Sequence, residues 1–221
     1  MNLTSTLLPP TWYWLSLLLT GGLVAWCAAK APWARLRQSS FSHAWLGAIV
    51  ALFALWQMRA GIHPGLGFHL LGASASTLMF GPHLALIAMA LVAVLNAVAG
   101  TLEPWSIPVN VLLMGVVPIA VSTLALRTVE RWLPSHFFVY IFGNAFFGTA
   151  LGMIAVGVMA SALLAGADVY PLEYLRSDYL PWYLLMSWAE AFTTGAAITL
   201  LVVYRPSWVS TFDDRRYLLG K

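Results

Sequence analysis

The sequence predicts an all-α fold, a polytopic bundle of about seven transmembrane helices that forms a single integral membrane domain, residues 1–221. Only 9% of the residues are charged and 61% are hydrophobic, and so few charges could not cover the surface of a water-soluble domain of this size. The chain also contains seven apolar runs of about the length, roughly 20 residues, that crosses a ~30 Å hydrocarbon core. These runs are residues 11–29, 41–58, 66–82, 83–100, 107–126, 135–166 and 181–204.

The first run, residues 11–29, does not have the pattern of a signal peptide, because no basic residue precedes it and its positive charges follow it. We treat it as an extra N-terminal span ahead of a core that covers residues 41–208. Cys27 follows the bulky Trp26 rather than the small residue of a lipoprotein site, so it is expected to be an apolar core residue. A single cysteine excludes an intramolecular disulfide and a multi-cysteine metal site.

The middle runs carry turn and kink signals. The third and fourth runs are joined by little more than Gly81, Pro82 and His83, which predicts a tight helical hairpin. In the fifth run, Pro118 predicts a kink that leaves a backbone carbonyl without its helical donor. The sixth run is longer than one span needs and is expected to tilt, kink or project beyond the bilayer.

Basic residues are distributed unequally between the two sets of loops. If the N-terminus lies outside, nine of the eleven Lys and Arg fall in inner loops, namely Lys30, Arg35, Arg37, Arg127, Arg131, Arg205, Arg215, Arg216 and Lys221. The outer loops hold Arg59 and Arg176. Because positive charge favours the cytoplasmic side, the sequence predicts an outside N-terminus, a cytoplasmic C-terminus and a multi-pass protein of the bacterial inner membrane. The net charge of +3 then describes orientation in the lipid bilayer, and no nucleic-acid partner is predicted.

Four polar side chains are predicted at membrane depth, where burial is costly. Glu190 is the carboxylate inside a span, about nine residues and roughly 14 Å of helix rise from the start of the last run. Asn96, Asn110 and Asn144 are the buried amides. One interpretation is that these four bind one another and fix the helix register. The other interpretation, a functional role, applies mainly to Glu190, because a buried carboxylate must be protonated or partnered.

Two of the five histidines, His63 and His69, lie at the outer end of the third run. The surrounding segment, residues 61–72, contains four glycines and a proline, which predicts irregular backbone that lines a cavity. Imidazole suits nickel, cobalt, copper and zinc, so both histidines are candidate metal ligands. The alternative is that each is a packing residue, because two histidines six residues apart do not define a site by spacing alone.

Three parts of the chain also carry short motifs in a fixed order. They are GFHLLGA at 67–73 followed by MFGP at 79–82, NVLLMGVVP at 110–118, and EAFTTG at 190–195 leading to RP at 205–206. Over roughly residues 60–208 these motifs resemble the cobalt/nickel substrate-binding permease component of energy-coupling factor transporters. Members of that family typically show GTSxHLLGG and LLGP, then NxxNMxVVGP, then GExxITG and RP.

In that family, the metal is held in a nearly planar nitrogen site at the outer side. The N-terminus threads into the bundle and supplies its terminal amine, a backbone nitrogen and the side chain of a histidine at position two. A further histidine comes from the HLLG motif, and the resemblance places His69 at this ligand. It also implies that Glu190 is a partner that orients a ligand or satisfies a helix break.

The chain departs from the family pattern at its N-terminal end. Position two is Asn2, and Leu113 replaces the asparagine expected before the family methionine. The extra first span argues against an N-terminus that reaches the bundle. The resemblance therefore carries over His69 alone, and His63 is the nearest candidate for a further ligand.

The resemblance implies a permease that takes up a divalent transition-metal ion, with nickel or cobalt expected and copper or zinc as alternatives. The chain has no Gly-x-x-x-x-Gly-Lys-Ser/Thr loop, so separate coupling and ATPase subunits are expected to supply the energy. The alternative is a non-transporting membrane scaffold or accessory subunit that keeps the fold without a metal site. The chain is not predicted to be an enzyme, because it lacks His-Glu-x-x-His, Gly-x-Ser-x-Gly and a pair of intramembrane carboxylates.

Overall fold

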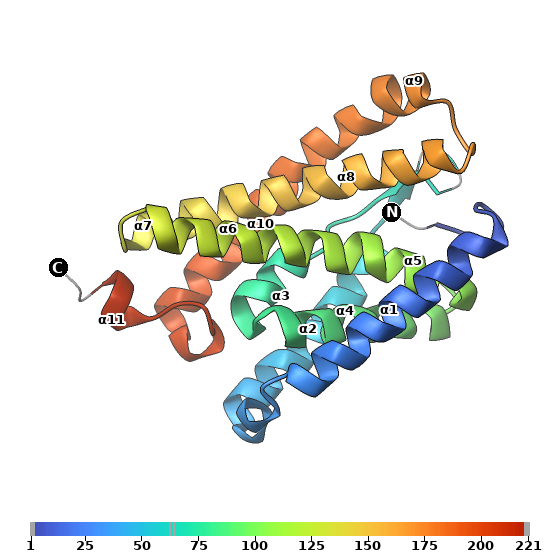
Figure 1. The fold of residues 1–221 in the computed structure, drawn as a ribbon. Helices are drawn as coiled ribbons and strands as arrows, with labels where there is room; N and C mark the ends of the chain where they lie inside the picture. Colours follow the sequence, from blue (N-terminus) through green and yellow to red (C-terminus); the bar gives the residue numbers. More distant parts are fainter. Residues whose placement is uncertain (1–2, 62, 64, 219–221) are drawn as a thin grey trace.

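Long apolar helices make up most of the structure, a computed structural model that describes residues 3–61, 63 and 65–218 (Figure 1). Within the described residues, five helices are long and apolar enough to cross a membrane. They are Pro10–Lys30, Ser39–Gln57, Pro104–Trp132, Phe137–Gly166 and Leu172–Tyr204. A shorter apolar helix, α4, covers Pro82–Val98. This arrangement is the predicted helical membrane bundle.

The first two runs fold as α1, Pro10–Lys30, and α2, Ser39–Gln57, joined by the short 3-10 helix η1, Trp33–Arg37. α1 begins at a proline, which suits the first helical position because an N–H there has no helical partner. Cys27 is buried in the core, as predicted. α1 packs against α4 and against α5, Ile107–Val111.

The third run is not the continuous helix that the sequence predicts. Its first part is extended and contains β2, Gly67–Phe68, which pairs antiparallel with β1, Ala60–Gly61. The helix begins only after Gly72, as α3, Ala73–Phe80. Gly72 has φ of 68°, a left-handed conformation that glycine adopts without strain. A Cβ at this position would also lie 2.1 Å from Leu52 Cδ2. The prediction of irregular backbone in this segment is therefore confirmed, while the prediction of a full helical span is wrong.

The third run still passes through the bundle. At its start, a Cβ on Gly65 would lie 2.3 Å from Leu7 Cδ2, so this glycine packs against the first residues of the chain. At its other end, the carbonyl of Met79 accepts a hydrogen bond from the N–H of Ser210, near the C-terminus (2.8 Å). Gly81, with φ of 80°, then turns the chain directly into α4. The tight hairpin between the third and fourth runs is thus confirmed.

The remaining long helices contain π-helical segments. In chain order, the elements are η2 Pro104–Ser106, α5, η3 Leu112–Val116, α6 Val117–Trp132, α7 Phe137–Tyr140, η4 Ile141–Gly148, α8 Thr149–Gly166, α9 Leu172–Tyr174, η5 Leu175–Tyr179, α10 Leu180–Tyr204, η6 Pro206–Trp208 and α11 Asp214–Tyr217. The segments η3, η4 and η5 are π-helical. Pro118 is the second residue of α6, two residues after Val116 at the end of η3, and the wider π turn accommodates its missing N–H. The backbone irregularity predicted at Pro118 therefore lies in the turn before it.

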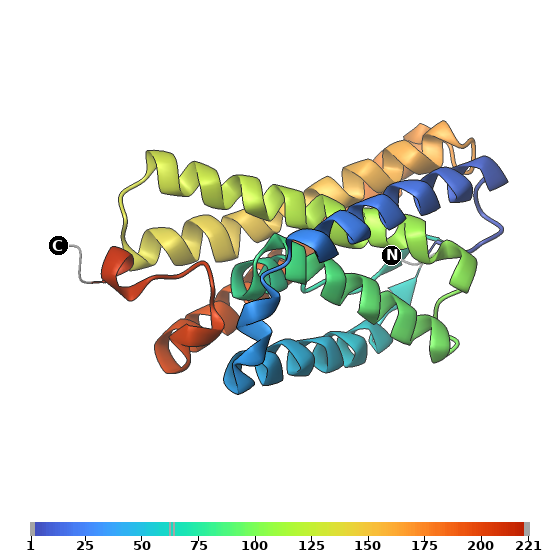
Figure 2. The ribbon, with the colours of Figure 1, turned by 60° about the horizontal axis from the view of Figure 1, so that its bottom comes forward.

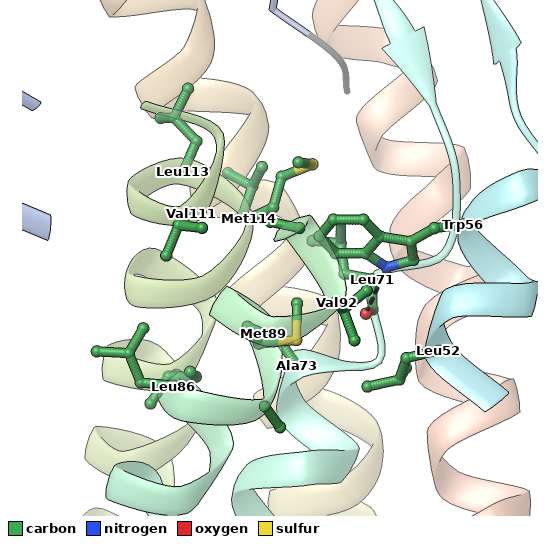
Figure 3. Packing of buried hydrophobic residues seen from close by; sticks show 14 of the residues in the cluster. Leu52, Trp56, Leu71, Ala73, Leu86, Met89, Val92, Val111, Leu113 and Met114 are labelled. Atoms are coloured by element: carbon green, nitrogen blue, oxygen red, sulfur yellow. Dashed lines mark hydrogen bonds between the residues drawn. The ribbon is translucent and has the colours of Figure 1, made fainter. Parts of the chain in front are cut away.

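The hydrophobic core is centred on α4. Met89 and Val92 are completely buried. In Figure 3 they lie between Met114 of η3 on one side and Trp56 of α2 with Leu71 on the other. This packing holds the extended segment that precedes α3 against the middle of the bundle.

The two ends of the bundle differ in charge. The start of α1 and helix α11 lie toward opposite ends of the bundle (Figures 1 and 2). The end at which α1, α6 and α10 finish carries Lys30, Arg35, Arg37, Arg127, Arg131, Arg205, Arg215 and Arg216 among the described residues. We call it the basic end. Arg59 and Arg176 lie at the opposite end. Which end faces the cytoplasm stays a prediction from charge.

Candidate metal site

His69 lies in the extended segment between β2 and α3, and its side chain is only 5% exposed. Its ring centroid is 4.9 Å from that of Trp56, whose Nε1 donates to the carbonyl of Leu71 (3.2 Å; Figure 3). His69 Nδ1 is 2.9 Å from the carbonyl oxygen of Leu70. Because a carbonyl can only accept, Nδ1 carries the proton, and in the neutral ring the lone pair is on Nε2. This is the tautomer in which Nε2 can bind a metal ion.

Glu190 of α10 anchors the same segment. Its side chain is 3% exposed. Oε2 accepts a hydrogen bond from the N–H of Leu71 (2.8 Å), and Oε1 accepts one from the N–H of Gly72 (2.6 Å). These groups lie at the start of α3, where a helix leaves N–H groups without internal partners and favours negative charge. In a hydrocarbon environment no water replaces such partners. Glu190 therefore fixes the backbone two and three residues beyond His69.

Asn110 of α5 holds the beginning of the chain inside the bundle. Its Oδ1 accepts a hydrogen bond from the N–H of Leu3 (3.0 Å), and its Nδ2 donates to the carbonyl of Leu3 (3.0 Å). Leu3 is completely buried. The expectation that the extra span keeps the start of the chain away from the bundle is therefore wrong for the N-terminal segment, residues 3–8. Met1 and Asn2, where the resemblance finds the ligand histidine missing, lie outside the described residues.

Side chains from two other places fix this N-terminal segment. The Tyr13 hydroxyl accepts from the N–H of Leu8 (3.1 Å) and donates to a carbonyl of the same segment (2.5 Å). The carboxylate of Glu103 accepts from the N–H of Ser5, and hydrogen bonds from the Ser5 side chain and backbone lower the pKa of Glu103. Because Leu7 packs against the start of the third run, the segment touches the stretch of chain that leads to His69.

His63 has different surroundings from His69. It is exposed, and its ring centroid is 6.0 Å from that of Tyr174 in α9. Its carbonyl accepts a hydrogen bond from the N–H of Leu66 (2.9 Å). In the part of the chain that the structure describes, no group of three or more His, Cys, Asp or Glu side chains could hold a metal ion. The structure thus places one of the two predicted ligands in the core and the other at the surface.

Among the described residues, Asn96 and Asn144 form no hydrogen bond with either histidine. Asn96 Oδ1 accepts from Gln57 Nε2 (3.2 Å) and Thr101 Oγ1 (3.0 Å), and its Nδ2 donates to the carbonyl of Val92 (2.8 Å). Asn144 lies in η4, and neither of its side-chain polar atoms has a hydrogen-bond partner within the described residues. Glu190, Asn110 and Asn96 each bind other partners, and Asn144 has none among the described residues. The interpretation that these four groups bond one another is therefore wrong.

The site therefore offers a buried imidazole with its lone pair on Nε2, in an anchored segment close to the beginning of the chain. Imidazole nitrogen is a suitable ligand for nickel, cobalt, copper or zinc. Sequence reasoning missed Trp56 and the N-terminal segment. The available signal was Asn110, an amide in an apolar run that required a partner.

Comparison with known proteins gives this geometry a context. The family model described as cobalt uptake substrate-specific transmembrane region matches residues 2–208, which include α1. The crystal structure of a truncated transition metal transporter has the same fold, with a TM-score of 0.78, 18% identity and coverage of 92% of this chain and 99% of that chain. A second transition metal transporter structure gives a TM-score of 0.78 and 18% identity over 91% of this chain and 92% of its own. No curated protein sequence matches the chain.

At 18% identity the two structures show the fold alone. The family match covers almost the whole sequence and confirms the resemblance seen in the motifs. The chain therefore belongs to the cobalt uptake substrate-specific transmembrane family.

Proposed function

We propose that this protein is the substrate-binding permease component of an uptake system for a divalent transition-metal ion, nickel or cobalt. The whole chain, residues 1–221, acts as one domain of a bacterial inner membrane with its N-terminus outside. Separate coupling and ATPase subunits supply the energy. Family membership supports metal uptake, and the basic end supports the orientation.

One observation carries the proposal. His69 is a buried imidazole whose Nδ1 faces a carbonyl, so Nε2 is the ligating nitrogen. The segment that carries it is held by Glu190 on one side and by Trp56 on the other. His63 is the candidate for a further ligand because it belongs to the same segment.

The alternative function is a membrane scaffold or accessory subunit that keeps the permease fold without a metal site. Two observations favour it: Asn2 stands where the resemblance expects a ligand histidine, and no group of three ligating side chains is present among the described residues. The two functions differ in a directly measurable property, the metal content of the protein.

We expect near-stoichiometric nickel or cobalt in the detergent-purified protein after loading, and loss of at least nine-tenths of it in His69→Ala. At matched metal concentration this loss corresponds to an affinity about 100-fold weaker, or about 2.7 kcal/mol. Elemental mass spectrometry measures both. His136→Ala is the matched control, because His136 caps α7 at the basic end, where its Nδ1 accepts from the N–H of Phe138 (3.1 Å). It should keep the metal. An unmetallated parent protein, or equal metal in His69→Ala, would favour the scaffold.

Binding is also expected to depend on pH. A protonated imidazole has no lone pair for a metal, so affinity should fall about ten-fold for each pH unit below about 6 if one histidine is the ligand. Isothermal titration of nickel or cobalt at several pH values between about 8 and 5 measures the slope. An affinity that is constant over this range would contradict ligation by histidine.

A further inference from the structure

A groove of about 390 Å³ opens between α1, α4 and α6 at the basic end of the bundle. It forms because α1 packs on α4 and α5 and then diverges from α6 (Figure 2). Its walls are largely apolar and include Leu23 of α1, Leu86 of α4 and Ile119 of α6. In a helix bundle surrounded by lipid, such a groove is filled by hydrocarbon, because its walls attract acyl chains and offer water few partners.

Charged and aromatic groups lie at one end of this groove. Arg127 of α6 and His83 of α4 line it, and the ring centroid of His83 is 5.1 Å from that of Trp26. Arg127 is exposed and has no ion pair or hydrogen bond in the described part of the chain. The carboxylate nearest to it in sequence, Glu130, is already paired with Arg216 (3.0 Å). The guanidinium therefore has no counter-charge within the described protein.

We propose that this groove binds an anionic phospholipid of the surrounding membrane. The phosphate contacts Arg127, since a guanidinium donates two parallel hydrogen bonds to phosphate oxygens. One acyl chain lies along the apolar wall between α1 and α6. Trp26 is placed as aromatic residues are at a membrane–water interface, with its ring at headgroup level. The site is separate from the proposed metal site, and its test does not depend on metal binding.

The test is native mass spectrometry of the full chain in a mild detergent, with added phosphatidylglycerol or phosphatidylcholine of identical acyl chains. Phosphatidylglycerol should bind more tightly. Arg127→Ala should weaken it about five-fold, the effect of one basic residue near an anionic lipid surface. The same variant should weaken phosphatidylcholine less, because the choline ammonium already neutralises the phosphate of that lipid. Arg131→Ala is the matched control, because the Arg131 guanidinium lies over the Trp132 ring (5.4 Å) and does not line the groove.

A second variant tests the acyl-chain part of the proposal. Ala120 is exposed in the groove, so Ala120→Phe fills the apolar wall and should reduce binding of both lipids. Glycerol phosphate and inorganic phosphate should not compete, because they lack the chain. Equal binding of the two lipids, equal effects of Arg127→Ala and Arg131→Ala, or unchanged lipid binding by Ala120→Phe would each overturn the site.

Discussion

Glu190→Leu is expected to lower the stability of the folded protein by about 2–6 kcal/mol, because two backbone N–H groups lose their acceptor at about 1–3 kcal/mol each. Those N–H groups belong to Leu71 and Gly72 and cannot be removed by a side-chain substitution. Removal of the buried carboxylate relieves its own desolvation cost, but it leaves both donors without a partner. Thermal unfolding in detergent, followed by far-ultraviolet circular dichroism, measures the loss.

Two comparisons separate this effect from a general loss of charge. Glu190→Gln keeps one acceptor oxygen and should lie between the parent and Glu190→Leu. Glu130→Gln removes a carboxylate from a partly exposed ion pair with Arg216 and should change stability by less than about 1 kcal/mol. His69→Ala should unfold close to the parent while losing metal. If Glu190→Leu unfolds like the parent, the carboxylate does not anchor the segment.

Much of the fold could be predicted because each helix that spans a membrane is encoded by a long apolar run. Six of the seven runs correspond to helices, and the basic residues gather at one end as the loop charges indicate. The third run shows where this signal ends. Leu66, Phe68, Leu70 and Leu71 make it apolar enough for a span, yet hydropathy does not register backbone conformation. The left-handed φ of Gly72 depends on contacts with Leu52 of α2 and Glu190 of α10, and β1 pairs with β2 through backbone groups.

The sequence indicated the buried polar residues of the candidate site, but it did not indicate the groups to which they bind. Glu190 is recognisable because a carboxylate in an apolar run is rare. Its partners are backbone amides about 119 residues away, and backbone amides have no sequence signature. Asn110 was recognised as a buried amide for the same reason, but its partner, Leu3, is 107 residues away and looks like an ordinary apolar residue.

The N-terminal segment also bears on the choice between permease and scaffold. A permease that takes ligands from the beginning of the chain, as the resemblance implies, needs this part of the chain inside the bundle. Leu3 is completely buried, and Asn110 binds both its N–H and its carbonyl. The buried N-terminal segment therefore supports the permease.

Asn110→Leu is expected to release the N-terminal segment from the bundle. The substitution removes both hydrogen bonds to Leu3 and the bond from Nδ2 to the carbonyl of Ser106 (2.9 Å). Only the two bonds to Leu3 hold the segment, and at about 0.5–1.5 kcal/mol for each bond their loss should make the segment open about 5- to 150-fold more often. Hydrogen exchange of a peptide that covers residues 3–8, followed by mass spectrometry, measures this opening directly.

Asn96→Leu is the matched control, because Asn96 is equally buried and makes three side-chain hydrogen bonds, but none to the N-terminal segment. Exchange in residues 3–8 should rise in Asn110→Leu alone. If nickel or cobalt binding falls in the same variant and not in Asn96→Leu, the N-terminal segment belongs to the metal site. If exchange rises and metal binding is unchanged, the segment closes the bundle without ligating the ion.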